Sequence, residues 1–160
     1  MKCLVGYITK TGTTEEVAAF IGQSLTAGGA EVDIRAIDTI ESVEGYDRLV
    51  LGSPINGMRV LPEFKSFLEA KIAGSGKPVD LFIVSYLYGP GRKIWKRAIS
   101  KEAERLKALV MADSVEIVAG RLPSALPGFA RFIFGTPGDL PLDTRDWNRI
   151  KAWAAGLARE

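Results

Sequence analysis

Five short apolar runs alternate with amphipathic helical patterns along this chain, and the alternation restricts its fold more than any other feature. The runs cover residues 3–8, 32–37, 48–52, 79–86 and 115–119. Such continuous apolar character is typical of strands buried on both faces of a parallel sheet. Helical patterns with one apolar stripe cover residues 15–25, 62–72, 93–110 and 144–159. We therefore predict an α/β fold, a doubly wound five-stranded parallel sheet with helices on both faces.

Length and composition fit one globular domain. The chain has 160 residues, of which 47% are hydrophobic and 25% are charged. We expect a single domain over residues 1–160, with an insert at about 121–143. No charged leader precedes the first run, and no apolar stretch approaches the ~18 residues of a membrane span, which predicts a cytoplasmic protein.

Reactive side chains are scarce. The chain has no histidine and one cysteine, Cys3, which lies in the first apolar run and is expected to be a buried, inert thiol. This composition excludes Ser-His and Cys-His catalysis and any histidine metal site. We predict neither a catalytic side chain nor a bound metal, and we expect a cofactor to supply the chemistry.

The sequence Thr9-Lys10-Thr11-Gly12-Thr13-Thr14 joins the first strand to the first helix. A helix N-terminus offers unpaired N–H groups and the positive end of its dipole, and short hydroxyl side chains add donors. The loop is therefore predicted to hold a phosphate. Thr13 and Glu16 also have the T-x-x-E spacing of a capping box. The alternative is a Thr-rich turn that caps the helix and binds nothing.

Two further loops share an edge of the predicted sheet with this one. Ligands of a doubly wound sheet bind beyond the carboxyl ends of its strands, where residues 9–14, 53–60 and 86–91 lie. The first loop matches neither the Walker pattern G-x-x-x-x-G-K-[ST] nor the dinucleotide fingerprint G-x-G-x-x-G. A receiver domain of this topology would need aspartates after strands one and three, where this chain has Ile8-Thr9 and Gly52-Ser53.

The pattern T-x-T-G-x-T resembles the first loop of the flavodoxin family, which binds the phosphate of FMN. The resemblance implies that FMN is the cofactor and that its phosphate is held by Thr9, Lys10, Thr11, Gly12, Thr13 and Thr14. It also implies that the flavin ring lies between two other groups of residues: Ser53, Pro54, Ile55, Asn56 and Gly57 on one side, and Ser85, Tyr86, Leu87, Tyr88 and Gly89 on the other. Gly57 is the candidate for tuning the redox potential, because a glycine peptide rotates at little steric cost to offer its carbonyl to a protonated flavin nitrogen.

Two functions compete within this family. Typical flavodoxins are strongly acidic electron shuttles, whereas this chain has a net charge of +2 and a sequence pI near 8.7. It is similar to the flavodoxin-like, quinone-dependent protoporphyrinogen oxidases in Gly52-Ser53-Pro54-Ile55, in a long insert after strand five, and in Gly138-Asp139 followed by Asp146-Trp147. That similarity implies an oxidoreductase that oxidises protoporphyrinogen IX with a quinone acceptor. The alternative is an electron carrier served by a redox partner protein, or a non-catalytic flavin-binding module.

Two segments indicate a partner near the flavin edge. Residues 92–101 carry Arg92, Lys93, Lys96, Arg97 and Lys101 with no acid, which suits porphyrin propionates or acidic lipid headgroups, or else is a solvated helix face. The insert holds the apolar cluster Phe129, Phe132, Ile133 and Phe134. Four roles are open for this cluster: to cover the substrate, to form a homodimer, to rest on the inner face of the membrane as a peripheral contact, or to pack on its own domain. Nucleic acid is not an expected partner, because the charge of the chain is balanced overall, with 21 basic and 19 acidic residues.

Overall fold

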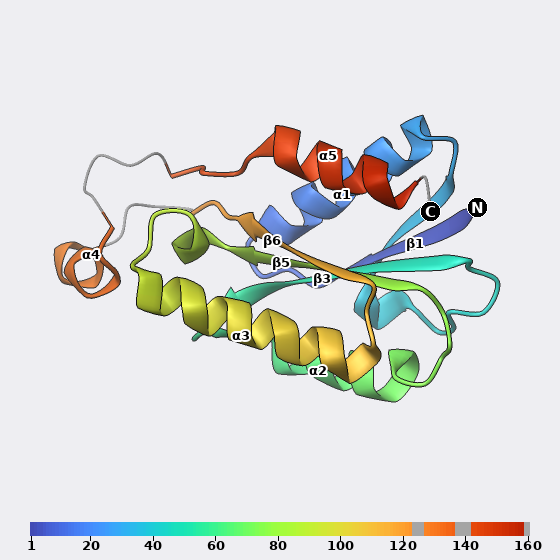
Figure 1. The fold of residues 1–160 in the computed structure, drawn as a ribbon, viewed down its shortest axis with the longest axis horizontal. Coiled ribbons are helices and arrows are strands. Elements are labelled where there is room, and N and C mark those ends of the chain that lie inside the picture. Colours follow the sequence, from blue (N-terminus) through green and yellow to red (C-terminus); the bar gives the residue numbers. More distant parts are fainter. Residues whose placement is uncertain (123–126, 137–141, 159–160) are drawn as a thin grey trace.

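Five parallel strands form the centre of the molecule, shown in Figure 1 as a computed structural model that describes residues 1–122, 127–136 and 142–158. The strand order is β2-β1-β3-β5-β6. These strands are β1 (Lys2–Tyr7), β2 (Glu31–Ala36), β3 (Arg48–Asn56), β5 (Val79–Ser85) and β6 (Ser114–Ala119). The predicted fold class is confirmed. The order reverses at β1, so the switch point of the sheet lies at the carboxyl end of this strand.

Helices cover both faces of the sheet. In Figure 1, α1 (Thr13–Ala27) and α5 (Trp147–Leu157) lie above it, while α2 (Pro62–Phe67) and α3 (Lys93–Val110) lie below. One π-helical turn, η2 (Leu68–Ile72), extends α2. The last helix begins three residues later than predicted, because the Asp146 side chain accepts a hydrogen bond from Arg149 N at 3.0 Å and caps it.

Alternating side chains of the strands divide the core into two layers. Leu4, Leu49 and Leu81 pack toward α2 and α3, whereas Cys3, Val50 and Phe82 pack toward α1 and α5. This period of two is that of strands buried on both faces. Cys3 is fully buried, as the sequence predicts, and burial raises the pKa of its thiol.

A buried ion pair lies within strands that the sequence shows as apolar runs. Arg48 Nε lies 2.7 Å from Asp80 Oδ2, and both side chains are almost inaccessible to solvent. Ser114 Oγ donates to the other Asp80 oxygen at 2.6 Å, and Arg48 Nη1 donates to the carbonyl of Leu157 at 3.3 Å. The pair joins the amino ends of β3 and β5 to β6 and α5, at the edge opposite to the predicted ligand site.

Strand β3 is longer than predicted. The sequence interpretation ended it at residue 52 and assigned residues 53–60 to a loop, but the strand continues to Asn56 and pairs antiparallel with β4 (Arg59–Val60). Gly57 and Met58 form the turn, with φ of 59° and 64°. Two consecutive residues with positive φ are typical of a type I′ hairpin. The loop prediction was wrong because Ser53 and Pro54 weaken the strand pattern while still pairing with β5.

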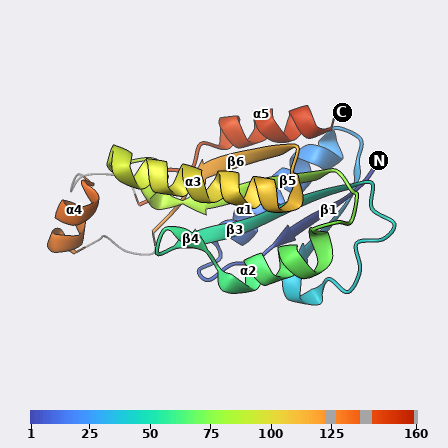
Figure 2. The same cartoon turned by 60° about the horizontal axis from the view of Figure 1, so that its bottom comes forward.

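The predicted insert leaves and re-enters the domain at one point. Arg121 and Asp143 form an antiparallel bridge, and Leu122 N donates to the carbonyl of Leu142 at 2.8 Å. Within the insert, which the sequence presents as a loop, a seven-residue helix α4 (Gly128–Phe134) lies beyond the carboxyl ends of the strands (Figures 1 and 2). Gly138 and Asp139, which contributed to the resemblance, lie outside the described residues. None of the helices in the described segments combines the length and apolar character needed to cross a membrane.

Candidate functional site

The Thr-rich loop lies at the carboxyl end of β1, where the sheet order reverses. Gly12 has a φ of 85°, and its N–H donates to Thr9 Oγ1 at 2.9 Å, which curls the chain into the first turn of α1. Gly12 is the N-cap and no side chain caps the helix. The predicted capping box is therefore wrong: Thr13 already belongs to the helix, and the Glu16 side chain binds Arg121 and Arg145 instead.

A buried, unsatisfied hydroxyl marks the N-terminus of α1. Thr14 is 1% exposed, and its Oγ1 has no hydrogen-bond partner. Thr13 is also buried, and its Oγ1 lies 3.4 Å from that of Thr11, while Lys10 is exposed. Burying a hydroxyl without a hydrogen-bond partner costs free energy. A phosphate at this helix end would accept hydrogen bonds from this hydroxyl and from the unpaired N–H groups of the first turn. The residues present therefore fit the phosphate of FMN.

The β3–β4 hairpin forms the second part of the site. Ser53 is fully buried, and its hydroxyl donates to the carbonyl of Pro54 at 3.0 Å and accepts from Leu61 N at 3.4 Å. Through these two hydrogen bonds the hydroxyl connects the two strands at the base of the hairpin. Pro54 and Ile55 are half-buried, and Asn56 and Gly57 are exposed at the tip. No heavy atom lies within 4 Å of the position of a Cβ on Gly57, so the positive φ, rather than a lack of space, favours glycine there.

A 3₁₀ turn after β5 forms the third part. It is η3 (Tyr86–Tyr88), whose residues are half-buried and follow the nearly buried Ser85. Gly89 N donates to the carbonyl of Tyr86 at 3.2 Å, and Gly91 N donates to that of Leu87 at 2.9 Å. Because β1, β3 and β5 are parallel neighbours, their carboxyl ends bring the Thr-rich loop, the hairpin and η3 to one edge. Contact of these residues with a flavin stays a prediction.

An ion-pair cluster that the sequence analysis missed lies behind the Thr-rich loop. Glu16, in the first turn of α1, binds Arg145 at 2.6 Å and Arg121 at 2.8 Å. The hydrogen bond from Arg145 lowers the pKa of Glu16, and likewise that of Asp143. No sequence signal links Glu16 to residues more than a hundred positions away. The cluster ties the base of the insert to the helix that carries the predicted phosphate site.

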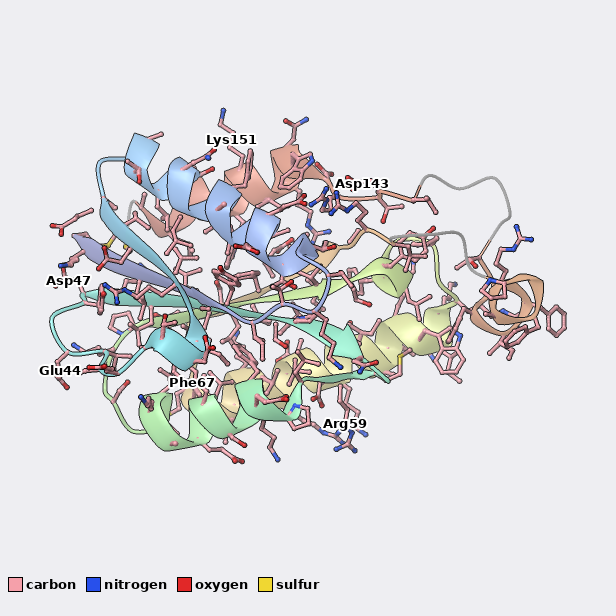
Figure 3. All side chains as sticks on the ribbon, turned by 180° about the vertical axis from the view of Figure 1, so that it is seen from behind. Glu44, Asp47, Arg59, Phe67, Asp143 and Lys151 are labelled. Carbon is pink, nitrogen blue, oxygen red and sulfur yellow. The ribbon has the colours of Figure 1, made fainter. Side chains whose placement is uncertain are left out.

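A cavity of about 1010 Å³ opens beside the site, between α2 and the short turn η1 (Ile37–Thr39) that follows β2. Of the predicted site residues, only Thr9 lines it. Its wall includes Tyr7, Ile37 and Phe67, and Figure 3 labels Phe67 in this region. No cluster of three or more potential metal ligands occurs among the residues that the structure describes.

The fold and the loops at its carboxyl edge define a flavodoxin-like α/β protein. A family model described as the flavodoxin domain matches residues 4–134, and the chain belongs to this family. The chain is also similar to the protoporphyrinogen IX dehydrogenase [quinone] of Escherichia coli strain K12, with 31% identity over 71 residues. That match spans 43% of this chain and 39% of the length of the relative.

Solved structures of flavodoxins share the fold. A flavodoxin from the domain Archaea aligns with a TM-score of 0.63 at 14% identity, covering 99% of this chain and 97% of that one. Oxidised flavodoxin 1 of Bacillus cereus gives a TM-score of 0.62 at 18% identity, with coverage of 100% and 99%. At these identities the likeness shows the fold alone.

Proposed function

We propose that this chain binds FMN at the carboxyl edge of its sheet and acts as an FMN-dependent oxidoreductase. Membership of the flavodoxin family implies a flavin cofactor. The observation that carries the proposal is the buried Thr14 hydroxyl without a partner at the N-terminus of α1. A dianionic phosphate would satisfy this hydroxyl and interact favourably with the helix dipole.

Each part of the edge has a role in this proposal. The hydroxyls and N–H groups of residues 9–14 hold the phosphate, and Lys10 adds a positive charge. The β3–β4 hairpin and η3 border the two sides of the ring and exclude water from it. Gly57 supplies a peptide that rotates at little cost and offers its carbonyl to the ring. Bound FMN supplies the electron-transfer chemistry, and the protein sets its environment.

For the substrate we propose a porphyrinogen, with a quinone as the electron acceptor. In each round the porphyrinogen loses two electrons and two protons, and the quinone gains them to become a quinol. The similarity to the E. coli dehydrogenase over 71 residues supports this assignment. The net charge of +2 also supports it. An electron carrier that is guided to basic partner proteins by electrostatic attraction would be expected to have a strongly acidic surface.

The second candidate is a flavodoxin-type electron carrier. The flavodoxin family model matches residues 4–134, whereas the similarity to the dehydrogenase covers 71 residues and 39% of the length of that relative. In this case a partner reductase reduces the flavin, and the porphyrinogen does not.

Two measurements test the proposal. Titration of the purified protein should show that FMN binds more tightly than riboflavin, and equal affinities would rule out the phosphate assignment. The double variant Thr11→Val/Thr13→Val should weaken FMN binding while the fold persists, since each hydroxyl bound to a charged acceptor contributes about 1.5–3 kcal/mol. Turnover of protoporphyrinogen IX with a menaquinone analogue would support the oxidoreductase, and reduction only by a partner reductase would favour the carrier.

A further inference from the structure

Helix α4 presents its apolar side away from its own domain. Phe129, Phe132 and Ile133 are 73%, 78% and 50% exposed. Their i, i+3, i+4 spacing places them on one side of the helix. Ala130 is buried and Phe134 half-buried, on the side that faces the domain. A helix that packed on its own domain through the aromatic cluster would show the opposite pattern, so only Phe134 of the predicted cluster fits that role.

The first turn of α3 holds α4 in this orientation. Arg92 Nη2 donates to the carbonyl of Phe132 at 2.9 Å, and Trp95 Nε1 donates to that of Ile133 at 3.3 Å. Arg92 N also donates to the carbonyl of Phe134 at 3.1 Å, and the rings of Trp95 and Phe134 meet edge to face at 5.6 Å. These contacts use the carbonyl end of α4 and leave its apolar side exposed, although the Arg92 guanidinium lies over the ring of Phe132 at 5.8 Å. Figures 1 and 2 both show α4 next to the start of α3.

Cations also lie on the first turns of α3, next to α4 (Figure 1). On α3, helical spacing places Lys93, Ile94 and Arg97 on one exposed face, and Ile94 is 65% exposed. Segments 92–101 and 127–136 together contain six cations and no acid. The whole chain has 21 cations and 19 acids, so acids outnumber cations in the rest of it. Positive charge is therefore concentrated where apolar side chains are exposed.

We propose that this surface, formed by Ile94, Phe129, Phe132 and Ile133 with Arg92, Lys93 and Arg97, binds the surface of an anionic lipid bilayer. The apolar side chains enter the boundary between headgroups and acyl chains, and the cations contact the headgroups. A second copy that bound here through a twofold axis would place the same cations opposite one another, with no acid in these segments to pair with them. This like-charge repulsion argues against a second copy of the chain as the occupant.

Bilayer binding would turn the carboxyl edge of the sheet toward the lipid, since α4 lies beyond the carboxyl ends of the strands (Figure 1). This consequence rests on the proposed function: a quinone dissolved in the membrane would then meet the flavin at that edge. Binding to the bilayer itself requires neither FMN nor quinone, so the two proposals can fail separately.

Co-sedimentation of the full chain with vesicles tests the proposal, using phosphatidylcholine alone or mixed equally with phosphatidylglycerol. The protein should sediment with the mixed vesicles and be released by high salt. Phe129→Ser/Phe132→Ser should lower the partition coefficient about tenfold or more. Lys93→Glu/Arg97→Glu should lower it at least about thirtyfold, as loss of two headgroup contacts predicts. Neither double variant should change the melting temperature, because all four side chains are exposed.

Two controls match these variants. Met111→Ser removes an 80% exposed apolar side chain at the opposite end of α3. Lys151→Glu reverses an exposed cation on α5, labelled in Figure 3. Both should bind vesicles as the wild type does. Equal binding to neutral and anionic vesicles, no binding at all, or unchanged binding by both double variants would overturn the proposal. A dimer in sedimentation velocity that Phe129→Ser/Phe132→Ser dissociates would also overturn it and assign the surface to a second copy.

The same preparations separate this proposal from the proposed function. FMN titration and reduction of a water-soluble quinone without vesicles should be the same for the wild type and both double variants. Vesicle binding without FMN binding would contradict the proposed function and leave the bilayer proposal intact. FMN binding and quinone reduction without vesicle binding would remove the bilayer proposal alone.

Discussion

Arg145 Nη1 lies 2.6 Å from Glu16 Oε2, so the residue that follows the insert forms an ion pair with the first turn of α1. The same guanidinium forms a two-point contact with Asp143, at 2.9 and 2.6 Å, and lies over the ring of Trp147 at 4.5 Å. Its side chain is 4% exposed. A change at the base of the insert should therefore affect the helix that carries the predicted phosphate site.

Replacing Arg145 with Met should lower the free energy of unfolding by about 2 kcal/mol at neutral pH, because two carboxylates lose a well-oriented partner. The folded-state pKa values of Glu16 and Asp143 lie below their unfolded values, through the hydrogen bonds from Arg145. The stabilisation is thus present above the unfolded pKa and is lost as the pH falls through the folded pKa. Denaturant unfolding at about pH 7 and about pH 3 should show the difference from wild type shrinking in acid. A constant difference would contradict the assigned cause.

Thr14→Val should have opposite effects on the empty protein and on FMN binding. Valine has the shape of threonine but no hydroxyl, so it removes a buried group without a partner and should leave the apoprotein equally stable or more stable. FMN affinity should fall about 10- to 100-fold, as loss of a hydrogen bond to a charged group predicts. Riboflavin affinity should not change. Thr39→Val is the control, because the hydroxyl of Thr39 in η1 already donates to the carbonyl of Ala36 at the end of β2. A fall in FMN affinity for that variant would show that the effect is not local.

Asp80→Asn should destabilise the protein by about 3 kcal/mol, because it removes the charge of the buried carboxylate that pairs with the Arg48 guanidinium. FMN binding to the folded fraction should be unchanged, since Asp80 lies at the amino end of β5. Chemical denaturation and flavin titration measure the two effects. Asp113→Asn is the matched control: this carboxylate is 3.7 Å from Arg48 but half-exposed, so a loss well under that of Asp80→Asn is expected.

Substitutions of Gly57 test the role of its backbone conformation, because there is space for a side chain at this position. Its φ of 59° suits glycine and is tolerated by Asn, whereas a β-branched residue is strained there. Gly57→Val should shift the midpoint potentials of the bound flavin more than it weakens FMN binding. Gly57→Asn should retain the hairpin and give smaller shifts. Potentiometric titration of both variants is the measurement, and unchanged potentials in Gly57→Val would exclude this peptide from tuning.

The sequence predicted most of the sheet, because strands buried on both faces leave continuous apolar runs. The run at residues 3–8, for example, differs from β1 by one residue at each end. Helix α3 matches its predicted range of 93–110, since its apolar stripe is regular over eighteen residues. The end of β3 was missed because a hairpin depends on pairing with β4, which the pattern along one strand does not contain.

The candidate site was predictable in position but not in detail. The Thr-rich loop lies where a strand-to-helix junction with Gly12 predicted it, yet the left-handed conformation of Gly12 displaced Thr13 from the capping role. The partners of Glu16 could not be foreseen, because Arg121 and Arg145 approach it only through the tertiary fold. Helix α4 was missed because seven residues between two proline-containing stretches give too short a periodic signal.

The bridge between Arg121 and Asp143 makes the insert a separable unit. The two ends of the insert already meet, so a short turn joining Leu122 to Leu142 would close a hairpin without moving β6 or α5. Loop-closure entropy grows only slowly with length, so residues can be gained or lost there at small thermodynamic cost to the sheet. Evolution or design can therefore change the surface beyond the carboxyl edge, and with it the partners that bind there, while the two-layered core stays unchanged.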